Sequence, residues 1–401
     1  MSKSSVTQLS VMMFIILGAI SALTPLAIDM YLPAMPAIAD DFGVAAGDVQ
    51  ITLTIYTLGF ALGQLFYGPL SDSIGRRPVL LGGVALFLVG AIGCAFSHSV
   101  EALIWVRMAQ GFAGAAAAVV IQAVVRDLYE SEDFARTMSF ITLVMTVAPL
   151  AAPMIGGHIS VWAGWRAVFA LLAIFAAIML VTIYFRIPET LDDKNKQPFH
   201  LRNSLRNFQV LLNNPQALGY IMCGAFSFSG MFVFLTAGSF VYIDYFGVEP
   251  QNFGYLFALN IVTMIFFTTL NGRVVKRFGS RNMLLFGLSI QLIAGIGLFL
   301  CWVFDLGLIA IVPCVMLYVG TISTVGSNSM ALLLNQYPNM AGTTSSLAGT
   351  LRFGLGSIMG FIVAQLPGDQ SWPMLIMMGA CSIAAFLMFK IFGERNREKL
   401  R

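Results

Sequence analysis

The stretch Gly68-Pro69-Leu70-Ser71-Asp72-Ser73-Ile74-Gly75-Arg76-Arg77-Pro78-Val79-Leu80 decides the fold of this chain. It is short and polar, and it separates two apolar runs that are each long enough to span a bilayer as a helix. So short a connection predicts that the two helices are antiparallel neighbours. We expect Gly68 to let backbones approach closely, Gly75 to take a positive φ, and Pro78 to lie in the first turn of the second helix.

The charges of this stretch predict its side of the membrane and its contacts. Arg76 and Arg77 favour the cytoplasmic side. Asp72 is an acid at a tight corner, so it needs a cation or a helix N-terminus as partner. We expect that partner at residues 342–345, where the eleventh apolar run begins, and expect Arg76 to pair with Asp127. The alternative is a solvated turn whose charges only set the topology.

Composition places the chain in a membrane. Of its 401 residues 58% are hydrophobic and 10% charged, which leaves too few charges to cover a soluble domain. The apolar runs do not alternate in polarity, so helices are expected and a β-barrel is not. We predict an all-α membrane protein with 12 transmembrane helices in two six-helix bundles related by pseudo-two-fold symmetry. The runs span residues 9–32, 50–70, 79–97, 101–125, 135–157, 166–186, 217–243, 253–272, 283–303, 306–333, 343–366 and 373–392.

Basic residues predict the orientation of these helices. Nearly all Lys and Arg lie at the termini or in alternate loops, and the opposite loops carry acids. Both termini are therefore expected in the cytoplasm. The first run is too long for a signal-peptide core and lacks a small-residue cleavage site, so it should remain as helix one. The five cysteines all lie in apolar runs, where we interpret them as packing residues.

An internal repeat predicts two halves. Residues 68–80 align without gaps to residues 272–284, with both glycines and the final Leu matched. A second match, 135–139 with 341–345, has nearly the same offset. A duplicated six-helix unit follows, with a substrate site between the halves near the midplane. We predict an N-terminal bundle, a cytoplasmic linker with a short interfacial helix (Phe199–Leu212), and a C-terminal bundle, at residues 1–190, 191–215 and 216–401.

Two ionisable residues in the first half are candidates for proton coupling, since charge inside a bilayer is costly. Asp29 is about 20 residues from the cytoplasmic end of its run, or ~30 Å along a helix. Arg107 enters from the outer side and should reach a similar depth, so the two are expected to interact. Asp29 would then load and release a proton, and Pro25 would bend the helix beside it. A static ion pair or an interfacial Asp is the alternative.

The substrate contacts are predicted from other polar and aromatic residues in the runs. Arg352 lies near mid-depth without a matching acid in its half, so it is expected to meet substrate carbonyls or Asp29 or, alternatively, backbone carbonyls. Such a set suits an amphiphilic, moderately apolar ligand. The remaining candidates are Tyr31, Tyr56, Gln110, Phe232, Asn260 and Asn328.

These motifs resemble those of the major facilitator superfamily. Residues 68–80 are similar to its signature between helices two and three, except at Ser73, where a basic residue is usual. Arg107-x-x-Gln-Gly matches a helix-four pattern linked there to proton coupling. The resemblance implies a cytoplasmic latch, built here from Gly68, Asp72, Gly75, Arg76 and Asp127.

Residues 148–157 resemble the superfamily's antiporter motif, with Ala148 and Ala152 in place of two glycines. Its prolines would bend the helix and its small residues would permit close packing. The likeness favours export over uptake, and ordinary tight packing is the alternative. The matching motif residues are Pro149, Pro153, Gly156 and Gly157.

Four stretches resemble the bicyclomycin-resistance (Bcr/CflA) family more narrowly, at residues 29–36, 56–64, 253–260 and 340–354. That resemblance implies proton-driven export of bicyclomycin-like or sulfonamide-like drugs across the bacterial inner membrane by alternating access. A proton-coupled exporter or importer of a small metabolite, such as an amino acid, is the alternative within transport.

The sequence gives little support to other functional classes. The polar segments contain no Cys/His metal set, no Ser/His dyad and no nucleotide loop, and the three histidines are expected in loops. We therefore expect no metal, no cofactor and no enzyme, although a channel or passive receptor stays open. The expected partners are small-molecule drugs, protons and the lipid bilayer, with no nucleic acid, and the chain is expected to work as a monomer.

Overall fold

The computed structural model describes residues 3–129, 131–191, 194, 208–337, 340–368 and 370–394. Within these residues the regular structure is helical. Eleven helices are long and apolar enough to cross a membrane, and a helix pair bent by 41° supplies a twelfth span. The predicted fold class is therefore confirmed. Most of the predicted interfacial helix lies outside the described residues.

The helices follow the predicted runs and extend beyond most of them. The first half contains α1 (Lys3–Ser21), α2 (Leu23–Asp29), η1 (Leu32–Ala34), α3 (Met35–Phe42), α4 (Ala46–Ile74), α5 (Arg76–Ala95), α6 (Val100–Leu128), α7 (Ser131–Ala163) and α8 (Trp165–Arg186). The second half contains α10 (Pro215–Ser239), η3 (Phe240–Tyr245), α11 (Pro250–Phe278), α12 (Ser280–Val303), α13 (Leu308–Gly320), α14 (Ile322–Gln336), α15 (Ala341–Ala364), α16 (Trp372–Met388) and η5 (Phe389–Gly393).

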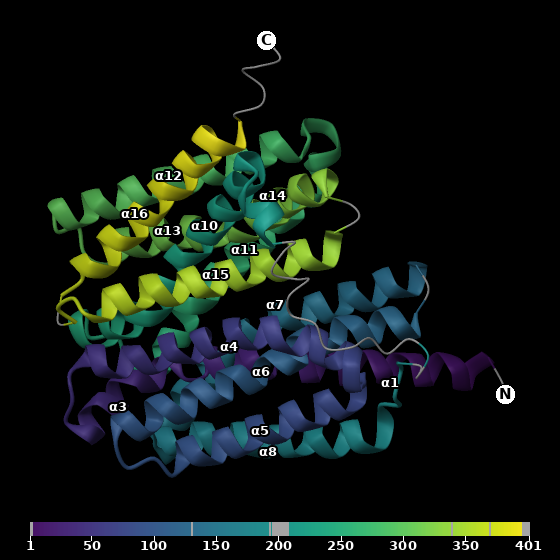
Figure 1. Cartoon of the computed structure of the whole chain (residues 1–401). Coiled ribbons are helices and arrows are strands. Elements are labelled where there is room, and N and C mark those ends of the chain that lie inside the picture. Colours follow the sequence, from purple (N-terminus) through teal and green to yellow (C-terminus); the bar gives the residue numbers. More distant parts are fainter. Residues whose placement is uncertain are drawn as a thin grey trace.

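The two halves lie one against the other, with the first half below and the second above in Figure 1. Helices α4 and α15 form much of the boundary, and α7 packs on α11 across it. Corresponding helices match in length: α4 and α11 each have 29 residues. Both end at a glycine with positive φ, 116° at Gly75 and 79° at Gly279. These matches fit the repeat found in the sequence.

The first span is broken twice, each time four residues before a proline. A proline lacks the N–H that would bond to the carbonyl of residue i−4, and its ring clashes with that carbonyl. Pro25 accordingly follows the end of α1 at Ser21, and Pro33 follows the end of α2 at Asp29. The bend predicted beside Pro25 is therefore present, and Asp29 stands at the second break.

The connection between α4 and α5 is shorter than the polar stretch suggested. Helix α4 continues through Ile74, and only Gly75 separates it from α5. Gly75 takes the predicted positive φ and Pro78 lies in the first turn of α5. The expected role of Gly68 was wrong: a Cβ there would meet only Val119 at 3.9 Å, an ordinary van der Waals distance.

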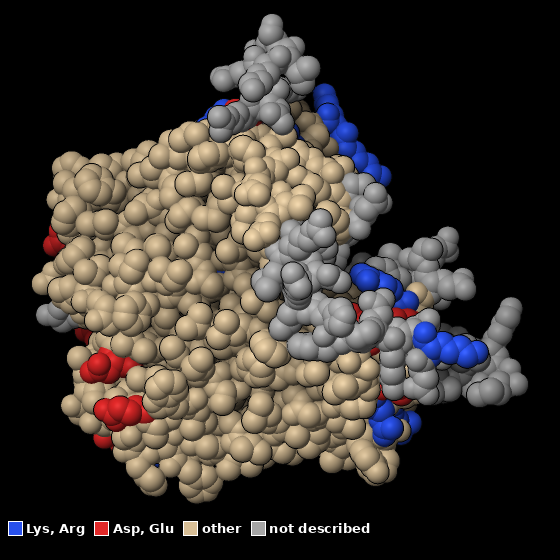
Figure 2. Space-filling view, in the orientation of Figure 1, with Lys and Arg blue, Asp and Glu red and all other residues tan. Residues whose placement is uncertain are grey.

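Charge is segregated along the helix direction. Figure 2 shows most visible Lys and Arg side chains at the end of the molecule where the N-terminus lies, and most Asp and Glu at the opposite end. An uncharged belt separates them, as expected for a protein whose sides face lipid. His158, expected in a loop, lies instead near the end of α7, because that helix runs to Ala163.

Candidate functional site

Arg107 is the centre of a buried polar cluster in the first half. Its side chain is 0% exposed. Its Nη1 donates to the carbonyl of Ala27 at 3.3 Å and to Oε1 of Gln110 at 2.9 Å. Ala27 lies in the last turn of α2, whose carbonyls carry partial negative charge. The guanidinium therefore compensates the end that Pro33 imposes on this helix.

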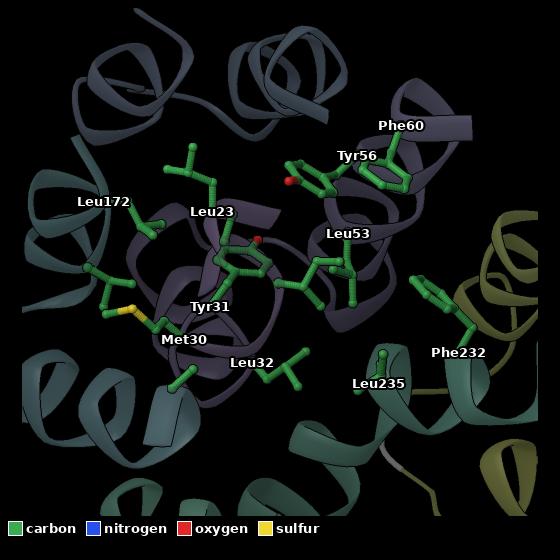
Figure 3. Packing of buried hydrophobic residues seen from close by; sticks show 14 of the residues in the cluster. Leu23, Met30, Tyr31, Leu32, Leu53, Tyr56, Phe60, Leu172, Phe232 and Leu235 are labelled. Carbon is green, nitrogen blue, oxygen red and sulfur yellow. The ribbon is translucent and has the colours of Figure 1, made fainter. Parts of the chain in front are cut away.

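Two tyrosine rings enclose the same guanidinium. Its central carbon lies 4.2 Å from the ring centroid of Tyr56 and 4.6 Å from that of Tyr31, within cation–π range. Figure 3 shows both rings inside the first half, and the hydroxyl of Tyr31 is 2.5 Å from that of Thr52. Three predicted substrate contacts, Tyr31, Tyr56 and Gln110, are thus fully buried partners of Arg107.

The predicted contact between Asp29 and Arg107 is not formed. Asp29 is 5% exposed, and among the described residues it makes neither an ion pair nor a side-chain hydrogen bond. Arg107 instead binds the carbonyl two residues earlier, because the helix end offers acceptors that need no second charge in the membrane. Nε and Nη2 of Arg107 have no hydrogen-bond partner among the described residues.

The two halves are closed at the acidic end of the bundle. Across the interface, a Cβ on Gly47 of α4 would lie 2.2 Å from the carbonyl oxygen of Ala364 of α15. Within the first half, a Cβ on Gly156 would lie 2.1 Å from the carbonyl oxygen of Met30, so only glycine lets α7 pack against the second break of the first span. Gly157 packs against Pro250 in the same region. The small residues of the predicted antiporter motif thus form part of this closure, and both its prolines, Pro149 and Pro153, lie inside α7.

An aromatic cluster occupies the middle of the interface. Phe60 is the central residue of α4, and its ring lies 4.7 Å from that of Phe353 on α15. Phe228 of α10 lies 5.0 Å from Phe353 and 5.6 Å from Phe232. We call Phe60, Phe228, Phe232 and Phe353 the aromatic cluster. Figure 3 shows Phe232 on the side of α10 that faces α4.

Arg352 borders this cluster and is only partly buried. Its guanidinium lies 5.6 Å from the ring centroid of Phe228. Among the described residues it has no hydrogen bond and no ion pair. A partly exposed cation beside apolar rings can receive a carbonyl, sulfonyl or carboxylate oxygen of a ligand whose body stacks on the rings.

The two predicted asparagines are both 2% exposed. Nδ2 of Asn328 donates to Oδ1 of Asn271 and to the carbonyl of Thr324, each at 2.8 Å. This amide therefore connects α14 to α11. Asn260 lies in the buried face of α11.

A charged network surrounds the α4–α5 connection. Arg76 pairs with Asp72 and, at 3.2 Å, with Asp127, which confirms the second predicted contact. Its Nη1 also donates to Oγ of Ser71 at 2.8 Å. The first partner expected for Asp72 was the start of α15; the structure gives it Arg76 instead, and the side chains of residues 341–343 lie outside the described set.

Glu189 belongs to this network and was missed from the sequence. Its carboxylate accepts hydrogen bonds from the backbone N–H groups of Arg76 at 2.9 Å and Arg77 at 3.2 Å. It thereby satisfies the N-terminus of α5, where negative charge is favoured. The sequence feature that could have predicted its role is that Glu189 is an acid shortly after the sixth apolar run, on the basic side of the membrane.

The second half has an acid at nearly the same repeat offset. Glu394 pairs with Arg281 and, at 3.1 Å, with Lys390. Burial raises the pKa of Glu394, but the hydrogen bonds from Lys390 and Arg281 outweigh it, so the pKa lies below its ordinary value. In each half, an acid that follows the last helix therefore binds residues at the connection between the second and third spans.

Comparison with known proteins identifies the family to which this chain belongs. The profile of the Major Facilitator Superfamily matches residues 17–361. The chain is 42% identical over 390 residues to the bicyclomycin resistance protein homolog of Haemophilus influenzae, covering 97% of this chain and 98% of that protein. It is 32% identical to a chloramphenicol resistance protein of Pseudomonas aeruginosa, over 90% of this chain and 86% of that one.

A solved structure of a D-xylose–proton symporter has the same fold, with a TM-score of 0.76 at 16% identity, over 94% of this chain and 97% of that one. At such low identity the likeness concerns the fold alone. The profile match and the relative at 42% identity carry the family assignment. The chain belongs to the Major Facilitator Superfamily, and within it to the bicyclomycin-resistance (Bcr/CflA) family.

Proposed function

We propose that this protein is a drug:proton antiporter that exports bicyclomycin-like or sulfonamide-like small molecules across the bacterial inner membrane. The names of its relatives support drug efflux, and the likeness of residues 148–157 to the antiporter motif supports export over uptake. One observation carries the coupling: Asp29 is a buried carboxylate without an ion-pair partner among the described residues, at the end of the short helix whose Ala27 carbonyl accepts from Arg107.

In the proposed cycle Asp29 takes a proton while the acidic end of the bundle is open. The halves then rock about their interface, and proton release on the other side leaves a carboxylate. That carboxylate can then pair with Arg107 of the same bundle, whose Nε and Nη2 have no hydrogen-bond partner among the described residues. Substrate is expected at Arg352 and the aromatic cluster. Substrate and proton need not touch, because each only has to favour the opposite charge state.

The proposal also includes the orientation of the protein in the membrane, its cytoplasmic latch and its oligomeric state. The basic end of the molecule would face the cytoplasm, with both termini there. Residues 68–80 and Asp127 would act as the cytoplasmic latch, and the chain would work as a monomer. Metabolite transport is the weaker alternative, since the relatives with assigned names are drug-resistance proteins.

Substrate-induced proton release tests this proposal. Purified protein in weakly buffered detergent solution would be mixed with bicyclomycin, and released protons read with a pH dye, for wild type, Asp29→Asn and Asp48→Asn. Asp48 is an exposed acid in the first turn of α4 and serves as the matched control. We expect release from wild type and Asp48→Asn, and none from Asp29→Asn with an unchanged melting temperature. Equal release from Asp29→Asn would move coupling to another residue, and no release from wild type would remove bicyclomycin antiport.

A further inference from the structure

Two of the five cysteines lie next to each other in the second half and have no role in the proposed transport cycle. Cys301 is in the last turn of α12, and Cys314 is on α13, the next helix along the chain. The two thiol side chains meet in a hydrogen-bond contact, and both are free thiols. The other three cysteines are buried on three different helices, at Cys94, Cys223 and Cys381.

The packing of α13 on α12 brings the two sulfur atoms together. A Cβ on Gly297 would lie 2.8 Å from Sγ of Cys314, so the missing side chain lets this sulfur rest on the surface of α12. Gly297 and Cys301 are four residues apart and therefore share one face of the helix, one turn from each other. A helical side chain leans toward the preceding turn, which directs the sulfur of Cys301 toward the space that Cys314 occupies above Gly297.

The connection between the two helices is fixed by its own hydrogen bonds. The N–H of Leu306 donates to the carbonyl of Cys301 at 3.0 Å. The N–H of Asp305 donates to the carbonyl of Trp302 at 3.3 Å, and Asp305 has a φ of 47°. Two such bonds around a left-handed residue form a Schellman helix end. This turn sets the direction in which α13 returns along α12, so the pairing of the two cysteines depends on local structure.

We propose that Cys301 and Cys314 form a redox-active pair that closes to a disulfide between α12 and α13. The step needs a two-electron oxidant, such as another disulfide or the diazene reagent diamide. With diamide, the thiolate of Cys314, the more exposed of the two, adds to one nitrogen of the N=N bond. The thiolate of Cys301 then attacks the sulfur of Cys314 and displaces that nitrogen. Two S–H bonds are lost, one S–S bond forms, and the diazene is reduced to a hydrazine that carries both protons.

Both cysteines lie near the acidic end of their helices, within about 9 Å of the connection between them. A small oxidant reaches this depth without crossing the membrane. In the proposed orientation this end faces the periplasm, a compartment in which disulfides form and persist. The pairing itself rests on the contact between the thiols, so a test on purified protein is independent of the transport proposal and of the orientation.

Counting thiols after oxidation of the folded protein tests the pair. Purified wild type in detergent is treated with diamide, the reagent is removed, and the protein is unfolded in the presence of a maleimide mass tag. Five cysteines give five tags before oxidation, and we expect three tags afterwards and five again after dithiothreitol. Five tags after oxidation would overturn the proposal. So would peptide mass spectrometry that finds a linked pair other than Cys301 with Cys314.

Single substitutions identify the two partners. Cys301→Ser and Cys314→Ser should each keep their four remaining thiols after diamide, because each variant lacks one member of the pair. Cys381→Ser is the matched control: Cys381 is a buried cysteine of the same half, and this variant should fall from four tags to two. A loss of two tags from Cys301→Ser or from Cys314→Ser would contradict the assignment.

The melting temperature of the oxidised protein tests the geometry. A disulfide that closes a loop of about a dozen residues, between helices that already pack together, should raise the melting temperature by about 2–10 °C. Dithiothreitol should reverse the rise. A melting temperature that falls on oxidation would show that the sulfurs join only when the helices are forced apart, which would contradict the proposed pair.

Discussion

Arg107 of α6 and Arg352 of α15 lie in membrane-spanning helices of opposite halves, and their surroundings differ. Arg107 is fully buried, bonded to a helix-end carbonyl and an amide, and enclosed by two tyrosine rings. Arg352 is partly exposed, touches one phenylalanine ring, and has no hydrogen bond within the described residues. Arg107 is therefore part of the packed interior of the first half. Arg352 has donors without a hydrogen-bond partner among the described residues, and its guanidinium lies within the second half, beside Phe228 of α10 and Gly326 of α14.

The largest effect should come from Arg107→Leu. It leaves the end of α2 and the Gln110 side chain without their donor and removes the cation–π contacts with Tyr31, Tyr56 and Phe169, so we expect a loss of about 3 kcal/mol or more. Thermal unfolding in detergent would measure it, as a markedly lower melting temperature and poor recovery of folded protein. A melting temperature within a degree or two of wild type would show that Arg107 does not stabilise the fold.

Arg352→Leu should separate binding from stability. Because its guanidinium has no hydrogen bond or ion pair to lose within the described residues, the stability cost should stay below about 1 kcal/mol. Drug affinity, measured by equilibrium binding, should fall about tenfold or more, while Arg352→Lys should recover part of it. Unchanged affinity together with a large loss of stability would reverse the roles of the two arginines.

A smaller difference is expected between the connections of the two halves. Arg76 has a side chain 10% exposed and two carboxylate partners, whereas Arg281 is 34% exposed and pairs with Glu394. Arg76→Gln should therefore cost about 1–2 kcal/mol, and Arg281→Gln less than about 1 kcal/mol. Melting temperatures of the two variants would rank them, and equal or reversed values would contradict the asymmetry.

The smallest effect is a pH dependence at Glu394. Its pKa is lower in the folded protein than in the unfolded chain, so its contribution to stability is present above the unfolded value and lost as pH falls through the folded one. The difference in melting temperature between wild type and Glu394→Gln should be largest near pH 7 and shrink below about pH 4. A difference that stays constant over this range would show that the ion pairs of Glu394 contribute nothing.

Some parts of the site followed from local sequence. The positive φ at Gly75, Pro78 in the first turn of α5 and the break beside Pro25 each depend on one residue type and its immediate neighbours. The pair of Arg76 with Asp127 was also predicted, since both lie where long helices end on the same side of the membrane. Glu189 was not predicted, because its partners are backbone N–H groups more than a hundred residues away.

Hydropathy and basic-residue placement by themselves determined that the chain is a membrane protein with twelve predicted helices, because these signals sum over one helix at a time. The internal repeat followed from the ungapped match of residues 68–80 with residues 272–284. Only the tertiary structure decided which polar groups meet. Arg107 lies 80 residues from Ala27, and the close approach of Gly156 to Met30 depends on how two helices cross. Interactions between helices depend on rotation and depth to within a fraction of a turn, and a sequence pattern sets neither that finely.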